Sequence, residues 1–314
     1  MISIKKYSVE DKNAWDDFVA KSKNATFLFF RDYMDYHADR FQDYSLMVYK
    51  KEKIIALFPA NIIDDNIIYS HQGLTFGGLL LSVQSTTTEV IEIFEQICRY
   101  AKDLHINKII YKCIPYIYHK YPAQEDLYAL FRLKAQRIAC SISSAIIQSN
   151  QIAFTELRKR GLKKAKQNEL IIEKQNNFDL FWKILTVNLR EKYNTNPVHS
   201  LEEIAFLENK FPENIEHYLV LSKEKEPVAG TVMYISDQVA RVQYISTTIE
   251  GRNMGALDFL FYNLVNNVYK NKPYFDFGQS TEQMGDYLNE GLIFQKEGFG
   301  GRGVVYEMYD LSTQ

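Results

Sequence analysis

The segment YFDFGQSTEQMGDYLNEGLIFQKEGFGGR, residues 274–302, decides how this chain is interpreted. A short apolar strand at residues 274–277 is predicted to end at Gly278, and polar side chains follow where a scaffold would place core residues. Gly298, Gly300 and Gly301 near its end let the backbone come close to another molecule. The pattern predicts a binding cleft.

The composition limits the class of protein. The 314 residues are 46% hydrophobic, which is enough for two domains, and the net charge is −2. This charge gives no general attraction to DNA or to an anionic membrane surface. No run approaches the roughly 20 apolar residues of a membrane-spanning helix, and the amino terminus lacks the apolar stretch of a signal peptide. A cytoplasmic protein is expected.

Several common site types lack support in the sequence. Cys98, Cys113 and Cys140 are far apart in apolar surroundings, which favours buried free thiols over disulfides or a zinc site. The six histidines show no paired ligand spacing, so no metal is expected. Residues 298–303 match GxGxxG, but only eleven residues follow them, too few to complete a dinucleotide-binding fold.

The two halves of the chain show the same predicted order of elements. Each has three strands, an amphipathic helix and a further strand. In the first half these lie at 45–50, 54–62, 66–81, 89–104 and 107–114, and a capping box is predicted at 86–89. In the second half the strands lie at 217–222, 227–236, 239–248 and 274–277, with the helix before the last of them. The order β-β-β-α-β, present twice, predicts an α+β protein.

A basic stretch, LRKRGLKKAK at residues 157–166, joins the two halves. It has six cationic residues and no acid, and two interpretations stay open: a solvated helix face, or a rim that binds phosphate. One short patch is too little for general nucleic-acid binding. After it, a loop is predicted at residues 190–200, ahead of a helix with a capping box at Ser200 and Glu203.

The segment EGRNMGALDFL, residues 250–260, resembles the donor-binding loop of acyl-CoA transferases of the GNAT class. In that class, backbone N–H groups at a helix start face the pyrophosphate of CoA. Arg252 and Gly255 match the Arg/Gln-x-x-Gly-x-Gly/Ala pattern, which implies a cofactor-binding role for both, and Leu257 departs from it. A loop glycine ahead of an ordinary core helix is the other interpretation.

Most of the chain resembles the FemABX-like branch of the GNAT superfamily, most strongly over residues 197–302. The segments with this resemblance are LRKRGLKKAK, PVHSLEE, VAGTVMYI, QYIST, YFDFGQS and LNEGLIFQKEGFGGR, the last with a Phe-x-Lys-x-x-Phe core. The resemblance implies two tandem GNAT-like domains, each a mostly antiparallel sheet flanked by helices. We expect them at 1–150 and 151–302, with the main site in the second and residues 303–314 returning to complete the first.

Lys296 and Asp276 are the predicted catalytic residues. Lys296 matches the lysine of the family's motif, and its ammonium can bind a phosphate or a developing negative charge; an exposed lysine on a terminal strand is the alternative. Asp276 lies at the end of a buried strand, where it either acts as a general base or accepts backbone hydrogen bonds from Gly278 onward.

Four further residues are predicted to bind substrate: Tyr244, Arg190, His199 and Arg302. The two arginines suit forked binding of a phosphate or carboxylate, and Tyr244 suits orientation of the acceptor. Each has an ordinary alternative as a surface pair, a packing aromatic or, for His199, a solvated loop residue.

The resemblance implies an enzyme, an N-acyltransferase that moves an acyl group, with acetyl expected, from CoA to an amine of a sugar or of a cell-envelope or polysaccharide precursor. Acyl-CoA is then the donor, without a metal, and the acceptor is a small-molecule or lipid-linked amine. One alternative is a FemABX-type transferase that takes an aminoacyl group from tRNA to a peptidoglycan or lipid-linked precursor. A catalytically inactive GNAT-like binding protein is a third interpretation.

Overall fold

The computed structural model describes residues 2–64 and 66–313, which form two compact units. Unit 1 contains the residues up to Ile142, Thr281–Tyr287 and those from Val305 onward; unit 2 contains Ser143–Ser280 and Leu288–Val304. The chain passes from one unit to the other within the strands β8 (Gln136–Ile147) and β16 (Arg302–Ser312). The first change of unit falls between Ile142 and Ser143, within β8. The domain division that we expected at 150/151 stays a prediction.

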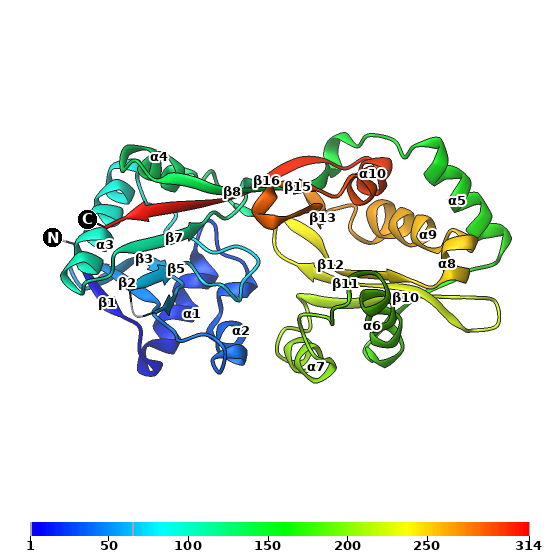
Figure 1. Ribbon diagram of the computed structural model, residues 1–314, viewed down its shortest axis with the longest axis horizontal. Coiled ribbons are helices and arrows are strands. Elements are labelled where there is room, and N and C mark those ends of the chain that lie inside the picture. Colours follow the sequence, from blue (N-terminus) through cyan, green and yellow to red (C-terminus); the bar gives the residue numbers. More distant parts are fainter. Residues whose placement is uncertain (1, 65, 314) are drawn as a thin grey trace. The chain divides into compact units, whose positions relative to one another are not determined.

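Unit 1 contains strands of two sheets (Figure 1). The first has the antiparallel order β1-β2-β3-β6, and the second joins β4, β5 and β7 to the end of β16. The strands are β1 (Ile2–Lys6), β2 (Leu46–Lys50), β3 (Lys53–Phe58), β4 (Asn61–Ile63), β5 (Ile67–Tyr69), β6 (Leu80–Leu81) and β7 (Lys108–Lys112). The helices are α1 (Lys12–Lys21), α2 (Arg31–Met34), α3 (Thr87–Asp103) and α4 (Glu125–Arg132).

The core of unit 1 forms where α3 buries its apolar face. Val90, Ile93, Phe94, Ile97 and Ala101 are buried at the predicted three- and four-residue spacing. Thr86 caps the helix by accepting from the Glu89 N–H. The capping box predicted there is therefore present as a simple N-cap, whereas the one at Ser200 and Glu203 is complete.

Unit 2 is built on one sheet with the strand order β8-β13-β12-β11-β10-β9. Neighbouring strands are antiparallel except β12 and β13. The strands are β9 (Ile171–Gln175), β10 (Ile215–Leu221), β11 (Pro227–Ile235), β12 (Val239–Thr247) and β13 (Tyr274–Gln279). The helices are α5 (Glu156–Gln167), α6 (Asp179–Tyr193), α7 (Leu201–Lys210), α8 (Ile249–Met254), α9 (Ala256–Asn263) and α10 (Glu290–Gly298). Two short strands pair with each other: β14 (Thr281–Glu282), which belongs to unit 1, and β15 (Tyr287–Leu288), where the chain returns to unit 2.

Helices cover both faces of the unit 2 sheet: α5 and α9 lie over one face, and α6 and α7 lie over the other (Figure 1). The core under α9 contains Leu260 and Phe261 of that helix, Phe275 and Phe277 of β13, and Phe299, all almost fully buried. The basic stretch is the helix α5, and its close neighbour is α9. The helix α5, which has the cationic residues, therefore packs against α9, and α9 in turn lies on the sheet.

Glycines allow α5 and α9 to approach closely. Gly255 has φ +77°, and a Cβ atom there would lie 2.2 Å from the carbonyl oxygen of Gly161. A Cβ atom on Gly161 would in turn lie 1.8 Å from an Asp258 carboxylate oxygen. Gly255 therefore ends α8 and begins α9 in a left-handed conformation that also fits beneath α5.

Three predicted elements differ from the structure. The loop expected from Arg190 begins later, because α6 continues to Tyr193 and ends at the left-handed Asn194. The lysine-containing segment is the helix α10, started by the Asn289 side chain, and not a terminal strand. Residues 66–81 contain two short strands separated by a loop, where one strand was predicted.

Candidate functional site

The strands β12 and β13 separate in the middle of the unit 2 sheet. They pair in parallel at only three positions, the last of them Arg241 with Asp276, although β12 continues to Thr247 and β13 to Gln279. The backbone turns at Gly278, where φ is +78°. Beyond this point β12 presents an edge that β13 does not cover, which gives an extended molecule room to lie along it.

Lys296 of α10 is buried, with 6% of its surface exposed. Its Nζ atom donates hydrogen bonds to the carbonyl oxygens of Gly278 (2.8 Å) and Gln279 (2.6 Å), at the end of β13. Burial lowers the pKa of Lys296 to about 8, while the nearby Asp276 raises this pKa and Arg241 lowers it further. The alternative of an exposed lysine on a strand is excluded.

Asp276 lies on the other side of the same turn and is fully buried. Its Oδ1 atom accepts from the backbone N–H of Gly278 (2.9 Å) and from the hydroxyl of Ser143 (2.5 Å). The backbone hydrogen bond that we considered for Asp276 is therefore present. Lys296 and Asp276, chosen separately from the sequence, meet at the point where the two strands part.

A pocket of about 780 Å³ lies within unit 2. Its walls come from α5, α6, the end of β12, the α8–α9 junction and α10. This volume is within the range of ordinary small-molecule sites. Ile245, Ser246 and Thr247 belong both to the pocket wall and to the uncovered part of β12, so the pocket adjoins this part of the strand.

The pocket has a strongly cationic lining. Arg158, Arg160, Lys164, Lys192 and Arg252 line it, whereas Asp258 is the one acid among the described residues that do so. Arg158 donates to Asp258 (2.9 Å) and lies over the ring of Phe299. The other four cations form no ion pair with a described carboxylate. Such a lining attracts a ligand with several negative charges.

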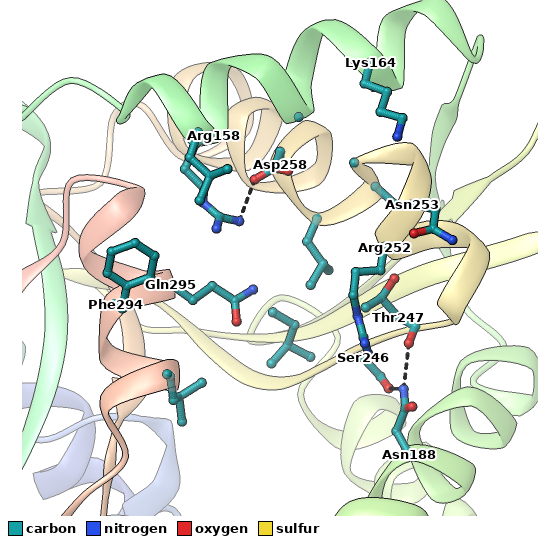
Figure 2. Close-up of a pocket in the computed structure, with 18 of the residues that line it drawn as sticks. Arg158, Lys164, Asn188, Ser246, Thr247, Arg252, Asn253, Asp258, Phe294 and Gln295 are labelled. Atoms are coloured by element: carbon teal, nitrogen blue, oxygen red, sulfur yellow. Dashed lines mark hydrogen bonds and ion pairs between the residues drawn. The ribbon is translucent and has the colours of Figure 1, made fainter.

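Two polar contacts shape the inner part of the pocket (Figure 2). Asn188 of α6 donates to the Ser246 hydroxyl (2.5 Å) and to the Thr247 carbonyl (2.8 Å), which fixes the end of β12. Figure 2 also shows the side chains of Arg158 and Gln295 extending into the pocket from different helices. The pocket therefore presents both donors and acceptors to a ligand.

Arg252 and Gly255, predicted to bind a cofactor, both line this pocket. Arg252 lies on α8, which begins at Ile249 and is capped by Thr248 accepting from the Gly251 N–H, and Gly255 follows its end. The helix start that faces the pocket is that of α9, where Gly255 offers no side-chain cap. Lys296 and Asp276 are not part of the pocket wall; they lie along the parted strands.

His199 and Tyr244, predicted separately to bind substrate, are in direct contact. The Nδ1 atom of His199 lies 2.5 Å from the Tyr244 hydroxyl, which also accepts from the His199 N–H (3.2 Å). Only 4% of the His199 surface is exposed, so the interpretation as a solvated loop histidine is wrong. The ring of Trp182 packs edge-on against Tyr244 and completes the group.

The two predicted arginines lie elsewhere on unit 2. Arg190 is exposed on α6 and donates to the side chain of Asn196 (3.0 Å). Arg302 is exposed at the start of β16 and donates to the Gly301 carbonyl (2.6 Å). Neither lines the pocket, and their predicted role in substrate binding stays a prediction.

Several pocket residues were missed in the sequence, although helical spacing would have found them. On α5, Leu157, Gly161 and Lys164 recur every three or four residues, and on α6 Leu185, Asn188 and Lys192 do the same. Lys159 and Lys163 point elsewhere than these positions and do not line the pocket. A helical projection of LRKRGLKKAK places the residues that line the pocket on one side of the helix and Lys159 and Lys163 on the other.

The described part of the chain contains no cluster of three or more metal-ligating side chains. Over the same residues, no helix is both long and apolar enough to cross a membrane. Cys98, Cys113 and Cys140 are free thiols, the second of them buried.

No protein-family model matches the sequence, and no curated protein matches it. Solved structures do match over nearly the full length. FemX has a TM-score of 0.69 at 10% identity, covering 96% of both chains. L-PGS from Bacillus licheniformis has a TM-score of 0.61 at 10% identity, covering 96% of this chain and 91% of the other. A tandem GNAT protein from the clavulanic acid biosynthesis pathway has a TM-score of 0.54 at 9% identity, covering 100% and 99%.

The chain therefore has the FemABX-type tandem GNAT fold. The predicted fold class, a mixed α+β protein with two tandem GNAT-like parts, is confirmed. Identities near 10% establish the fold and leave the reaction to be argued from the site itself.

Proposed function

We propose that the protein is a GNAT-fold N-acyltransferase that binds an acyl-CoA in the unit 2 pocket and transfers the acyl group to an amine of a sugar or cell-envelope precursor. The observation that supports this most is the lining of the pocket, five cations against one acid around about 780 Å³. A donor with a pyrophosphate and a further phosphate matches this charge. The tandem GNAT neighbour, described as a structure without AcCoA, makes acetyl-CoA the first donor to test.

The uncovered edge of β12 gives the donor a path from the pocket toward Lys296. Ile245 and Thr247 lie at the pocket, and the carbonyl oxygen of Val242 lies beside Gly278. An acyl chain that lies along this edge places its carbonyl group near the end of β13. Alignment of this kind can supply several kcal/mol of a transfer barrier, about 7 in well-oriented model reactions.

In the transfer step the neutral amine nitrogen of the acceptor forms a bond to the acyl carbonyl carbon, and the C–S bond of the thioester breaks. The proton lost by the amine goes to water or to the leaving thiolate. Negative charge develops on the carbonyl oxygen meanwhile. Lys296 uses two of its three N–H donors on Gly278 and Gln279, and we assign the third to this oxygen.

A second candidate is an aminoacyl-tRNA donor. FemX and L-PGS have higher TM-scores than the tandem GNAT protein, and a second neighbour is a domain of a putative lysylphosphatidylglycerol synthetase. The cationic residues of α5 and α6 also suit the 3′ end of an RNA, whose phosphates follow one another along a strand. In this case the bond that breaks is the C–O ester bond to the ribose.

Binding measurements separate these donors. Calorimetric titration with acetyl-CoA, and with a short aminoacylated acceptor-stem RNA, should show binding of one of them to the parent protein. Lys164→Ala and Arg252→Ala should each weaken that binding about tenfold or more. Lys163→Ala is the matched control, with the same charge one residue away on α5 but outside the pocket. Equal losses in Lys163→Ala and Lys164→Ala would show that the pocket is not the donor site.

A further inference from the structure

We propose that Asp276 is a positioning residue that acts through Lys296: its buried carboxylate fixes the turn at Gly278 and keeps the Lys296 side chain charged during transfer. This inference rests on the proposed function, because it concerns the group to which we assigned the oxyanion. It separates the roles of the two residues that were first selected together as catalytic.

The geometry starts from Gly278, which both side chains bind. Asp276 accepts from its N–H (2.9 Å), and Lys296 donates to its C=O (2.8 Å). Gly278 has a positive φ, so its peptide groups do not continue the strand ladder. The carboxylate and the ammonium therefore hold the two sides of one turn, and displacement of either side chain disturbs the support of the other.

A third group restrains the carboxylate. The Ser143 hydroxyl donates to the same Oδ1 atom that accepts from Gly278, at 2.5 Å, and Asp276 has no exposed surface. Two hydrogen bonds to Oδ1 therefore restrain this buried carboxylate. It is poorly placed to pick up a proton from a substrate amine, which favours the positioning role over a role as general base.

Charge balance gives Asp276 its importance for Lys296. Burial favours the neutral amine, and so does Arg241, which stands opposite Asp276 in the strand pair. Asp276 is the acid that acts against both of them. With the carboxylate removed, every remaining influence favours loss of the proton, and a neutral amine stabilises an oxyanion much less.

The pH dependence of kcat tests this. In the parent, activity should fall on the alkaline side as Lys296 loses its proton, near its pKa of about 8. In Asp276→Asn, which keeps the side-chain shape and an oxygen for the Gly278 N–H, this alkaline limb should move about one pH unit or more lower. Ser143→Ala should move it in the same direction by less. The acid limb, set by the acceptor amine, should not move.

Glu216→Gln is the matched control. Glu216 is a partly buried carboxylate on β10, a different strand from that of Asp276, and it accepts hydrogen bonds from the hydroxyls of Tyr218 and Tyr269. Its pH profile should coincide with that of the parent. An Asp276→Asn enzyme that loses activity equally at all pH values, with its alkaline limb unmoved, would show that Asp276 only shapes the turn and would overturn the proposal.

A measurement without turnover distinguishes this failure from failure of the proposed function. NMR titration of ¹³C-labelled lysine, with the Lys296 signal assigned by its loss in Lys296→Arg, should show a lower titration midpoint in Asp276→Asn. An unchanged midpoint would overturn the inference. A lowered midpoint combined with full activity of Lys296→Met would instead remove Lys296 from the reaction, and with it the mechanism under "Proposed function".

Discussion

Lys296 and Asp276 bind opposite sides of Gly278, one at its carbonyl oxygen and the other at its N–H. The ammonium comes from α10 and the carboxylate from β13, so the pair ties this helix to the end of the strand. Because β12 has already parted from β13 at this point, no strand partner on that side holds the turn. The side chains of Asp276 and Lys296 therefore bind the backbone N–H and C=O of Gly278, as a neighbouring strand would in a regular sheet.

Lys296→Met should therefore lower stability as well as activity. The methionine keeps the apolar stem, but it leaves the carbonyl groups of Gly278 and Gln279 without their donor in a buried place. A buried acceptor that loses its partner costs about 1–3 kcal/mol. Chemical denaturation measures the change; a midpoint equal to the parent's would contradict it.

The activity of Lys296→Met should fall through kcat, by about 100-fold or more, with a smaller change in KM. The reason is that charge on the carbonyl oxygen develops only in the transition state. Steady-state kinetics at a saturating donor concentration gives both constants. A large rise in KM with unchanged kcat would point to a ground-state phosphate contact.

Gly255 is unsuited to a test of donor binding by a bulky substitution. A Cβ atom at this position meets the Gly161 carbonyl at 2.2 Å, and the φ of +77° is itself unfavourable for other residues. Gly255→Ala should thus destabilise the protein by about 1–3 kcal/mol. Gly291→Ala on α10 is the comparison, because its Cβ meets nothing closer than 3.8 Å. Gly291→Ala should leave the thermal midpoint unchanged or raise it; equal losses in both variants would refute the packing argument.

The sequence predicted the parts of this site that depend on local pattern. The apolar spacing of α3 and α9, the cap at Ser200 and the glycine at 255 follow from rules that act within a few residues. It did not predict that Lys296 reaches back to β13, or that His199 packs on Tyr244 some 45 positions later. These contacts depend on how the chain crosses the sheet, and no window of neighbouring residues contains that information.

The net positive charge of the pocket lining can be raised by replacing its one described acid, Asp258. Asp258→Asn removes the acid of the lining and releases Arg158, which Asp258 holds at 2.9 Å. Binding of an anionic donor should tighten several-fold, more at low than at high salt. Stability should fall at the same time, because the Arg158 guanidinium is largely buried and loses its partner. Calorimetry at two salt concentrations checks the first effect, and weaker binding in Asp258→Asn would count against a donor of this charge.

Acid should destabilise unit 2 through His217. This side chain of β10 is 1% exposed and stacks on the ring of Phe178, with centroids 5.0 Å apart. Burial lowers the pKa of His217 to about 4, from an ordinary value of 6.5. The folded protein therefore favours the neutral ring, and the unfolded chain binds the extra proton first as the pH falls.

The neutral His217 contributes its full stabilisation above pH 6.5. As the pH falls from about 6.5 to 4 this contribution is lost, and the total loss in the free energy of unfolding is about 3 kcal/mol. His217→Leu keeps an apolar side chain against Phe178 and removes the titrating group, so its free energy of unfolding should fall less steeply over this pH range than the parent's. His105→Gln, at an exposed turn of unit 1, should follow the parent. Urea denaturation at several pH values gives these curves. Parallel curves for His217→Leu and the parent would show that His217 takes up its proton inside the folded protein without cost.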